Sequence, residues 1–219
     1  MSDIFREVEE EVKRDQVAQL LKKHGTLIIS VLLVVVIGVG GYRAYEYWQR
    51  TKAAEAGQKF ETALQFESDG KAAEARAVFD DLARSAPQGY GMLARFRVAG
   101  ALVKSDRPAA IKAFEALAAD TALDQTLRDL ASVRAAMLQI ETLPYADLKA
   151  RLEAHAQAGK PWRLTARETL GLAAYKGGQM DEAGKQFDAM LADSAATQTV
   201  RQRAEMMLAL IAGGAVSGQ

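Results

Sequence analysis

The sequence predicts an all-α protein in which a single N-terminal transmembrane helix precedes an α-solenoid of helix hairpins. Three observations lead to this prediction: an uncharged apolar run near the N-terminus, a helix-favouring composition after Trp48, and a motif that returns after about 36 residues. We expect a tail over residues 1–24, a membrane anchor over 25–48 and a helical domain over 49–219. The last helix of this domain, over residues 197–212, is expected to cap the solenoid.

The apolar run, from Gly25 to Tyr42, contains 18 residues and no charged side chain. A helix rises about 1.5 Å per residue, so the run covers roughly 27 Å of the roughly 30 Å hydrocarbon core of a bilayer. Aromatic residues follow it, as expected where a spanning helix meets the lipid headgroups. The expected anchor residues are Leu27, Ile28, Val31, Leu32, Val35, Ile37, Tyr42, Tyr45 and Trp48.

A buried strand, a core helix and a cleaved signal peptide are the alternatives to a retained anchor. The run is too long for a strand, and core helices seldom lack polar residues over four turns. A signal peptide begins with a short basic segment, whereas here 24 residues with six acidic side chains precede the run. The bulky residues after the run are also unlike a cleavage site, so we interpret it as a retained anchor.

Loop charge does not decide the orientation of this anchor. Four Lys or Arg residues lie within 7–24 and four within 43–60, so the positive-inside rule gives a tie. The Lys22–Lys23 pair beside the run, and the aromatic residues beyond it, favour a cytoplasmic N-terminus. Apolar residues at three- and four-residue steps predict an amphipathic helix in the tail, either a docking element or a solvated continuation of the anchor.

A motif of glycine, alanine, phenylalanine and a further apolar residue recurs after the anchor. Alanine follows glycine by five residues, phenylalanine comes four later and the apolar residue three later. Serine replaces glycine in the second copy, and a degraded copy between the second and the last is expected to use Ala146. The residues expected to pack the repeats are Gly70, Ala75, Phe79, Leu82, Ala110, Phe114, Leu117, Gly171, Gly178, Ala183, Phe187 and Met190.

A hairpin of two helices accounts for this spacing. Glycine permits a tight turn, the small alanine lets the helices approach, and phenylalanine fills the space between hairpins. One hairpin cannot bury its apolar face alone, so successive copies stack into a solenoid. The alternative is an irregular helical bundle with chance similarity. The spacing resembles that of the tetratricopeptide repeat, with Leu170 and Gly171 at first-helix positions.

The composition favours binding of proteins over other functions. The 28 basic and 28 acidic side chains balance, which argues against a partner held by phosphate contacts, so no nucleic acid is expected. Cysteine is absent, and no phosphate loop or hydrolase motif occurs. His155 is expected at a solvated helical position. We therefore predict no enzyme, no catalytic, cofactor-binding or metal-binding residue, and no small-molecule substrate.

The resemblance to tetratricopeptide repeats implies a concave surface lined by the first helix of each hairpin. Its candidate residues are Phe60, Leu64, Met92, Arg95, Leu102, Leu138, Leu172 and Tyr175. This mainly apolar set suits an apolar peptide or a partner helix. The alternative is that the capping helix of the chain itself fills the groove.

The segment "MSDIFREVEEEVKRDQVAQLLKKHG", the span after it and the degenerate repeats together resemble the YfgM-like proteins of bacterial inner membranes. The resemblance implies a single-pass protein with its N-terminus in the cytoplasm and its helical domain in the periplasm. It also implies an ancillary role at the SecYEG translocon and association with a membrane-anchored prolyl-isomerase-type chaperone. A scaffold of a division or cell-wall complex and a cytoplasm-facing regulatory repeat protein remain alternatives.

Overall fold

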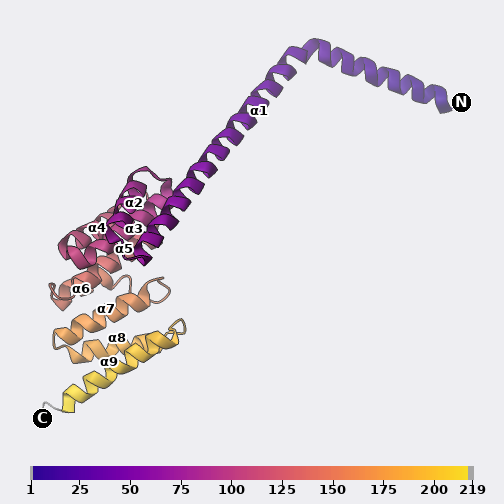
Figure 1. Ribbon diagram of the computed structural model, residues 1–219. Coiled ribbons are helices and arrows are strands. Elements are labelled where there is room, and N and C mark those ends of the chain that lie inside the picture. Colours follow the sequence, from indigo (N-terminus) through magenta and orange to yellow (C-terminus); the bar gives the residue numbers. More distant parts are fainter. Residues whose placement is uncertain (1, 217–219) are drawn as a thin grey trace. The chain divides into compact units, whose positions relative to one another are not determined.

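The computed structural model describes residues 2–216, with side chains at 22, 25–27, 29–87 and 89–213 (Figure 1). Nine helices and no strand occur within these residues. The helices are α1 (Ser2–Ser68), α2 (Ala72–Ser85), α3 (Gln88–Ser105), α4 (Arg107–Ala119), α5 (Gln125–Leu138), α6 (Tyr145–Leu152), α7 (Arg163–Lys176), α8 (Met180–Leu191) and α9 (Gln198–Val216). The chain is therefore all-α, as predicted.

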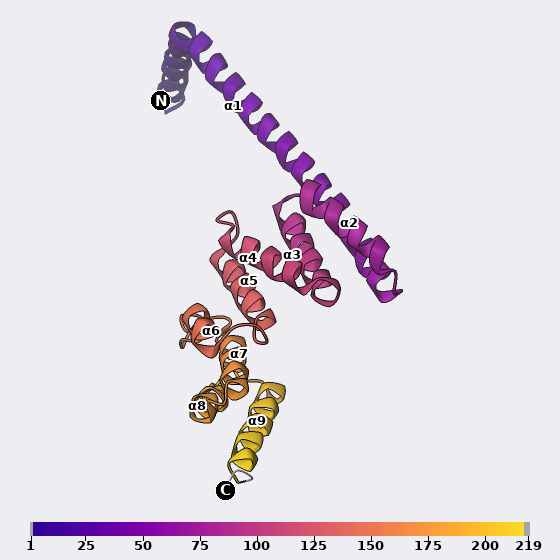
Figure 2. The same cartoon turned by 90° about the vertical axis from the view of Figure 1, so that its left-hand side faces the viewer.

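The chain divides into two compact units, residues 1–55 and residues 56–219, and α1 contributes to both. In the second unit, each helix from α2 onward packs against the next one along the chain (Figure 2). The end of α1 forms a hairpin with α2, and α3–α4, α5–α6 and α7–α8 form the following hairpins. The last helix, α9, packs against α8.

In the first unit, α1 carries one segment that is long and apolar enough to span a membrane. Its most apolar 18-residue stretch, within Gly25–Ser68, has a mean hydropathy of 2.3 and is not buried. The expected anchor residues with described side chains are more than half exposed: Leu27, Val31, Leu32, Val35, Ile37, Tyr42, Tyr45 and Trp48. The side chain of Ile28 lies outside the described residues, as do nearly all those of the tail.

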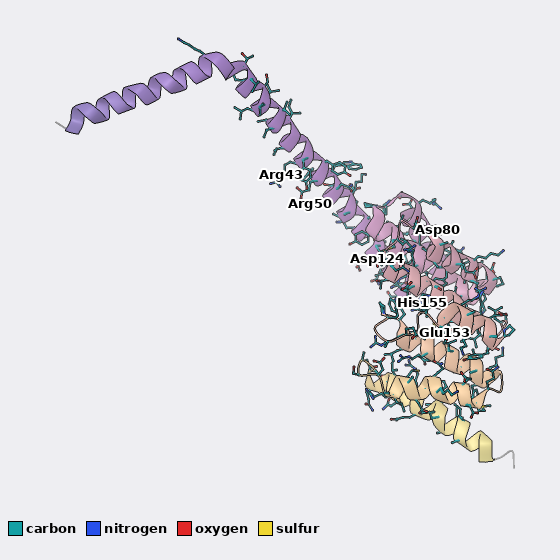
Figure 3. All side chains as sticks on the ribbon, turned by 180° about the vertical axis from the view of Figure 1, so that it is seen from behind. Arg43, Arg50, Asp80, Asp124, Glu153 and His155 are labelled. Atoms are coloured by element: carbon teal, nitrogen blue, oxygen red, sulfur yellow. The ribbon has the colours of Figure 1, made fainter. Side chains whose placement is uncertain are left out.

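Polar side chains follow this apolar segment on the same helix. Arg43 and Arg50 both donate to the carboxylate of Glu46, from three residues before it and four after it (Figure 3). The rings of Tyr45 and Trp48 lie 6.3 Å apart, centroid to centroid. Exposed ion pairs of this kind contribute little to stability. The segment therefore combines aromatic and charged groups next to the apolar run, as at the edge of a membrane span.

Three core clusters hold the second unit together. The first forms around Phe79, the second around Phe114 and the third around Phe187, all of them at most 4% exposed. The other motif residues in the second helices are also buried: Ala75, Leu82, Ala110, Leu117, Ala183 and Met190. Gly171 of α7 is buried as well, and a Cβ atom there would lie 2.7 Å from Cζ of Phe187.

The turns of the first and last hairpins depend on glycine. Gly70 and Gly178 have φ values of +76° and +71°, a region that side-chain-bearing residues seldom adopt. After each, a backbone N–H reaches five residues back, from Lys71 to Phe66 and from Gln179 to Ala174. This bond is the signature of a Schellman motif. The second hairpin manages without glycine because Asp106 caps α4, accepting from the N–H of Ala109 at 3.0 Å.

The third hairpin departs from the expected register. Ala146 is exposed, so the prediction that it takes the alanine position is wrong. Pro144 is the N-cap residue of α6. The buried residues of α6 are Tyr145, Leu148 and Leu152, which are spaced by three and four residues. The bulky Tyr145 takes the place of a small residue, and α6 has only 8 residues where α2 has 14.

Replacing Gly178 by alanine is expected to destabilise the domain by about 1 kcal/mol, because the positive φ brings a Cβ atom close to the following carbonyl. Gly177 is the matched control: it lies next to Gly178 with a φ of −76°, which alanine adopts freely. The measurement is the urea midpoint of each variant. Equal losses at the two positions would contradict the role given to the left-handed turn.

Enlarging Ala183 to leucine is expected to cost about 1–3 kcal/mol through overpacking. This alanine is fully buried in the third core cluster. The comparison variant is Gly184→Leu, at the next residue on α8. No atom lies within 4 Å of the position that an added Cβ would take there. An unchanged thermal midpoint for Ala183→Leu would show that the helices have room to separate there.

Candidate protein-interaction surface

The candidate groove residues lie on the first helices of the hairpins, and every one of them is partly buried. They do not belong to one cluster. Phe60 and Leu64 pack on the first core cluster and Met92 and Leu138 on the second. Leu172 and Tyr175 pack on the third. The structure thus uses much of their apolar area to join helices.

Phe60 shows this most clearly. Its ring centroid lies 5.3 Å from that of Phe79 in an edge-to-face arrangement and 5.8 Å from that of Tyr90. The hydroxyl of Tyr90 in turn occupies the space next to Gly57, 2.8 Å from where a Cβ atom would stand. Phe60 therefore fills the junction between the first hairpin and α3.

Arg95 is also engaged within the domain. Its guanidinium donates to the Asp120 carboxylate at 2.6 Å, a contact that ties α3 to the loop between α4 and α5. This hydrogen bond, with the backbone N–H of Ala122, holds the pKa of Asp120 below its usual value. Arg95 thus fixes the junction of two hairpins.

Side-chain hydrogen bonds join residues that lie about one repeat apart in the sequence. They span 35 to 37 residues and link neighbouring hairpins across the second half of the domain. The donor–acceptor pairs are Arg151–Glu115, Trp162–Thr126, Lys176–Ile140, Tyr145–Glu182 and Arg203–Glu168. This offset of 35 to 37 residues agrees with the repeat length of about 36 residues.

A buried carboxylate, which the sequence analysis did not single out, anchors the end of the last hairpin. Asp193, with its side chain only 8% exposed, receives two bonds from Arg163 at 2.6 and 2.9 Å and one from Arg167 at 3.1 Å. The bond from Arg163, together with the N–H of Ala195, lowers the pKa of Asp193 to about 2. Arg201 closes the same loop by donating to the carbonyl of Asp193 at 2.9 Å.

His155 lies in a turn after α6 and not on a helix, so the expectation of a solvated helical position is wrong (Figure 3). Its side chain is 18% exposed, and its Nδ1 lies 3.8 Å from Oδ1 of Asp129 on α5. Gln125 donates to the same oxygen at 2.6 Å. The helix that the sequence seemed to continue ends at Leu152, and the turn folds His155 back onto α5.

The structure also has a hollow of about 470 Å³ at the α7–α8 turn, and none of the candidate groove residues lines it. Polar and charged side chains line it, among them Gln179, Asp181, Glu182 and Lys185. Lys185 pairs with Glu182 at 2.6 Å, and this bond holds the pKa of the carboxyl below its usual value. Among the described residues, no group of three or more acidic or histidine side chains is placed to hold a metal ion.

The comparisons with known proteins agree with this architecture. The family model of a tetratricopeptide repeat-like domain matches residues 19–212, from before the apolar run to the second half of α9. Comparison with curated proteins and with solved structures gives no match. The match to this family suggests that the protein interacts with other proteins. The family match covers most of the chain, and the protein is therefore a member of the tetratricopeptide repeat-like domain family.

Proposed function

We propose that this protein is a non-enzymatic membrane adaptor that binds protein partners through its helical-repeat domain. One observation carries the proposal: α1 contains an exposed apolar segment of membrane-spanning length and also supplies the first helix of the repeat domain. A tetratricopeptide repeat-like domain presents helices to other proteins, and the helix that begins it would hold that surface at a bilayer.

The finer proposal is an ancillary subunit of the SecYEG translocon in a bacterial inner membrane, with the repeat domain in the periplasm. The sequence of the tail and span, which resembles that of YfgM-like proteins, supports it. A membrane-anchored prolyl-isomerase-type chaperone would be a second partner, so that the adaptor brings chaperone action to emerging secreted chains. Partner binding would fall to the exposed parts of Leu102, Leu172 and Tyr175, because Phe60 and Arg95 are already engaged.

Topology is tested first, and the absence of cysteine makes the test clean. A single cysteine in place of Ser194, an exposed residue in the α8–α9 loop, is treated in intact cells with a maleimide that crosses only the outer membrane. Labelling is the expected result. Labelling only after the inner membrane is broken would overturn the periplasmic placement and the translocon proposal with it.

Partner binding is tested by placing a photoreactive phenylalanine analogue at Tyr175 or Leu102 in the full chain. Illumination of cells is expected to give adducts that contain a translocon subunit or the isomerase. Asp188, exposed on α8, is the matched control position and should give no such adduct. Equal adducts from Asp188 and Tyr175 would overturn the proposed surface, and adducts with division proteins alone would replace the translocon by another envelope complex.

A further inference from the structure

Helix α5, the first helix of the third hairpin, packs against α4 before it and α6 after it (Figure 2). Its buried residues are Asp129, Ala131, Val133, Ala135 and Ala136. The other side of the helix carries five residues at helical spacing, and we call them the α5 face: Leu127, Leu130, Arg134, Met137 and Leu138. The four apolar residues are partly buried, whereas Arg134 is exposed. The α5 face therefore presents apolar side chains with one cation among them.

Arg134 occupies the centre of the α5 face. Residues three and four positions apart are neighbours on a helix, so Leu130 precedes Arg134 by one turn, and Met137 and Leu138 follow it by one turn. Among the described residues, no group forms a hydrogen bond or an ion pair with Arg134. The guanidinium has five N–H donors in a planar fork that matches a carboxylate. These donors are open to a partner molecule.

The carboxylates on and around α5 are engaged elsewhere. Asp129, the one acidic residue of α5, is among its buried residues on the other side of the helix. On α7, the next first helix, Glu168 accepts two bonds from Arg203, at 2.7 and 2.9 Å. Glu141, in the turn after α5, pairs with Lys176 at 3.1 Å. The positive charge of the α5 face is therefore not compensated by these groups.

We propose that the α5 face binds an apolar segment of a protein partner that carries one aspartate or glutamate, with this carboxylate on the guanidinium of Arg134. The inference rests on the proposed function and specifies the chemistry of the partner. Leu138 of this face is one of the candidate groove residues, and Leu172 and Tyr175 lie on the next first helix. A nucleic acid or an anionic lipid surface would need several cations, whereas this face offers one.

Arg134 would act on specificity more than on affinity. An apolar segment that covers the α5 face takes water away from the guanidinium, and a polar group that is left without a partner in such a place is costly. A carboxylate on the segment replaces the lost water, and the surrounding apolar side chains make this charge pair stronger than one in open solvent. A segment without an acidic residue is therefore disfavoured, although its apolar contacts are the same.

The test uses the full chain in lipid nanodiscs and three fluorescent helical peptides of about 18 residues. Each peptide has an apolar face of leucines, and the residue at the centre of this face is glutamate, glutamine or lysine. Fluorescence anisotropy measures binding, and empty nanodiscs give the background from lipid. We expect the glutamate peptide to bind the native protein about fivefold more tightly than the glutamine peptide, and the lysine peptide to bind most weakly.

Substitutions at Arg134 assign this preference to one side chain. Arg134→Gln is expected to abolish it, and Arg134→Glu to reverse it in favour of the lysine peptide. The matched control is Arg84→Gln, on α2, which removes an arginine that is also exposed and also has no ion pair among the described residues. It should keep the native preference. Thermal unfolding verifies that the variants remain folded, as expected for exposed positions.

Three results would overturn the inference. They are equal binding of the three peptides to the native protein, a glutamate preference that survives Arg134→Gln, and no binding above that of empty nanodiscs. Each leaves the proposed function standing if the Tyr175 adducts with a translocon subunit or the isomerase form in cells. Absence of those adducts from the native protein would instead be a failure of the proposed function.

Discussion

Replacing Phe187 by alanine is expected to lower the free energy of unfolding by about 4 kcal/mol, because the loss of a buried ring leaves a cavity in the core. The side chain is 1% exposed and lies in the third core cluster, against Gly171 of α7. Urea unfolding of the purified chain measures the loss. Asp188→Ala, on the exposed neighbour, should change it by less than about 0.5 kcal/mol.

A second substitution at Gly171 makes this prediction sharper. In the native protein Gly171→Ala should destabilise by about 1–3 kcal/mol, because the added methyl group meets the Phe187 ring at 2.7–3.0 Å. In the Phe187→Ala background the same methyl group enters the vacated space, so the effect should vanish or change sign. Such neighbouring sites are not additive when they share one space. Additive losses would show that the ring and the glycine are not in contact.

Replacing Asp193 by asparagine is expected to destabilise the domain by about 2 kcal/mol near neutral pH and hardly at all near pH 2. The arginine side chains around the carboxyl lower its pKa from 3.8 to about 2 in the folded protein. A lowered pKa means that the folded state binds the proton more weakly than the unfolded state does. The stabilisation is therefore complete above about pH 4 and is lost as the pH falls through about 2.

The measurement compares the urea midpoints of the native protein and Asp193→Asn between pH 2 and pH 7. Asp188→Asn removes an exposed carboxylate from α8 and is the matched control, with an expected change below about 0.5 kcal/mol at each pH. A constant difference between the native protein and Asp193→Asn down to pH 2 would contradict the role of the charge. It would show that shape alone fixes the loop between α8 and α9.

The sequence was most informative where the structure depends on local spacing. The motif around Phe79 and Phe187 follows helical periodicity, and the run from Gly25 to Tyr42 is long and free of charge, so these helices could be predicted from neighbours in the chain. The positive φ of Gly178 follows from the same kind of local pattern. These features depend on turns and helix faces, which a few adjacent residues determine.

The contacts that the sequence did not predict join residues far apart in the chain. Asp193 meets Arg163 across 30 residues, and no local pattern marks either as a partner of the other. In the third hairpin, Pro144 shifts the register by one residue, and Tyr145 instead of Ala146 then faces the core. The candidate groove residues lie on the first helices of the hairpins, but the resemblance could not show that Phe60 would pack against Tyr90.

Helix α5 belongs to two core clusters at once. Ala131 and Ala135 face the second core cluster, and Val133 and Ala136 face the third. The sequence can be divided into repeats, but a chain cut on either side of α5 would lose buried residues from one of the two clusters. Nearest-neighbour coupling of this kind makes adjacent repeats melt together. The second half of the domain is therefore indivisible, and fragments that end near α5 should not persist as folded pieces.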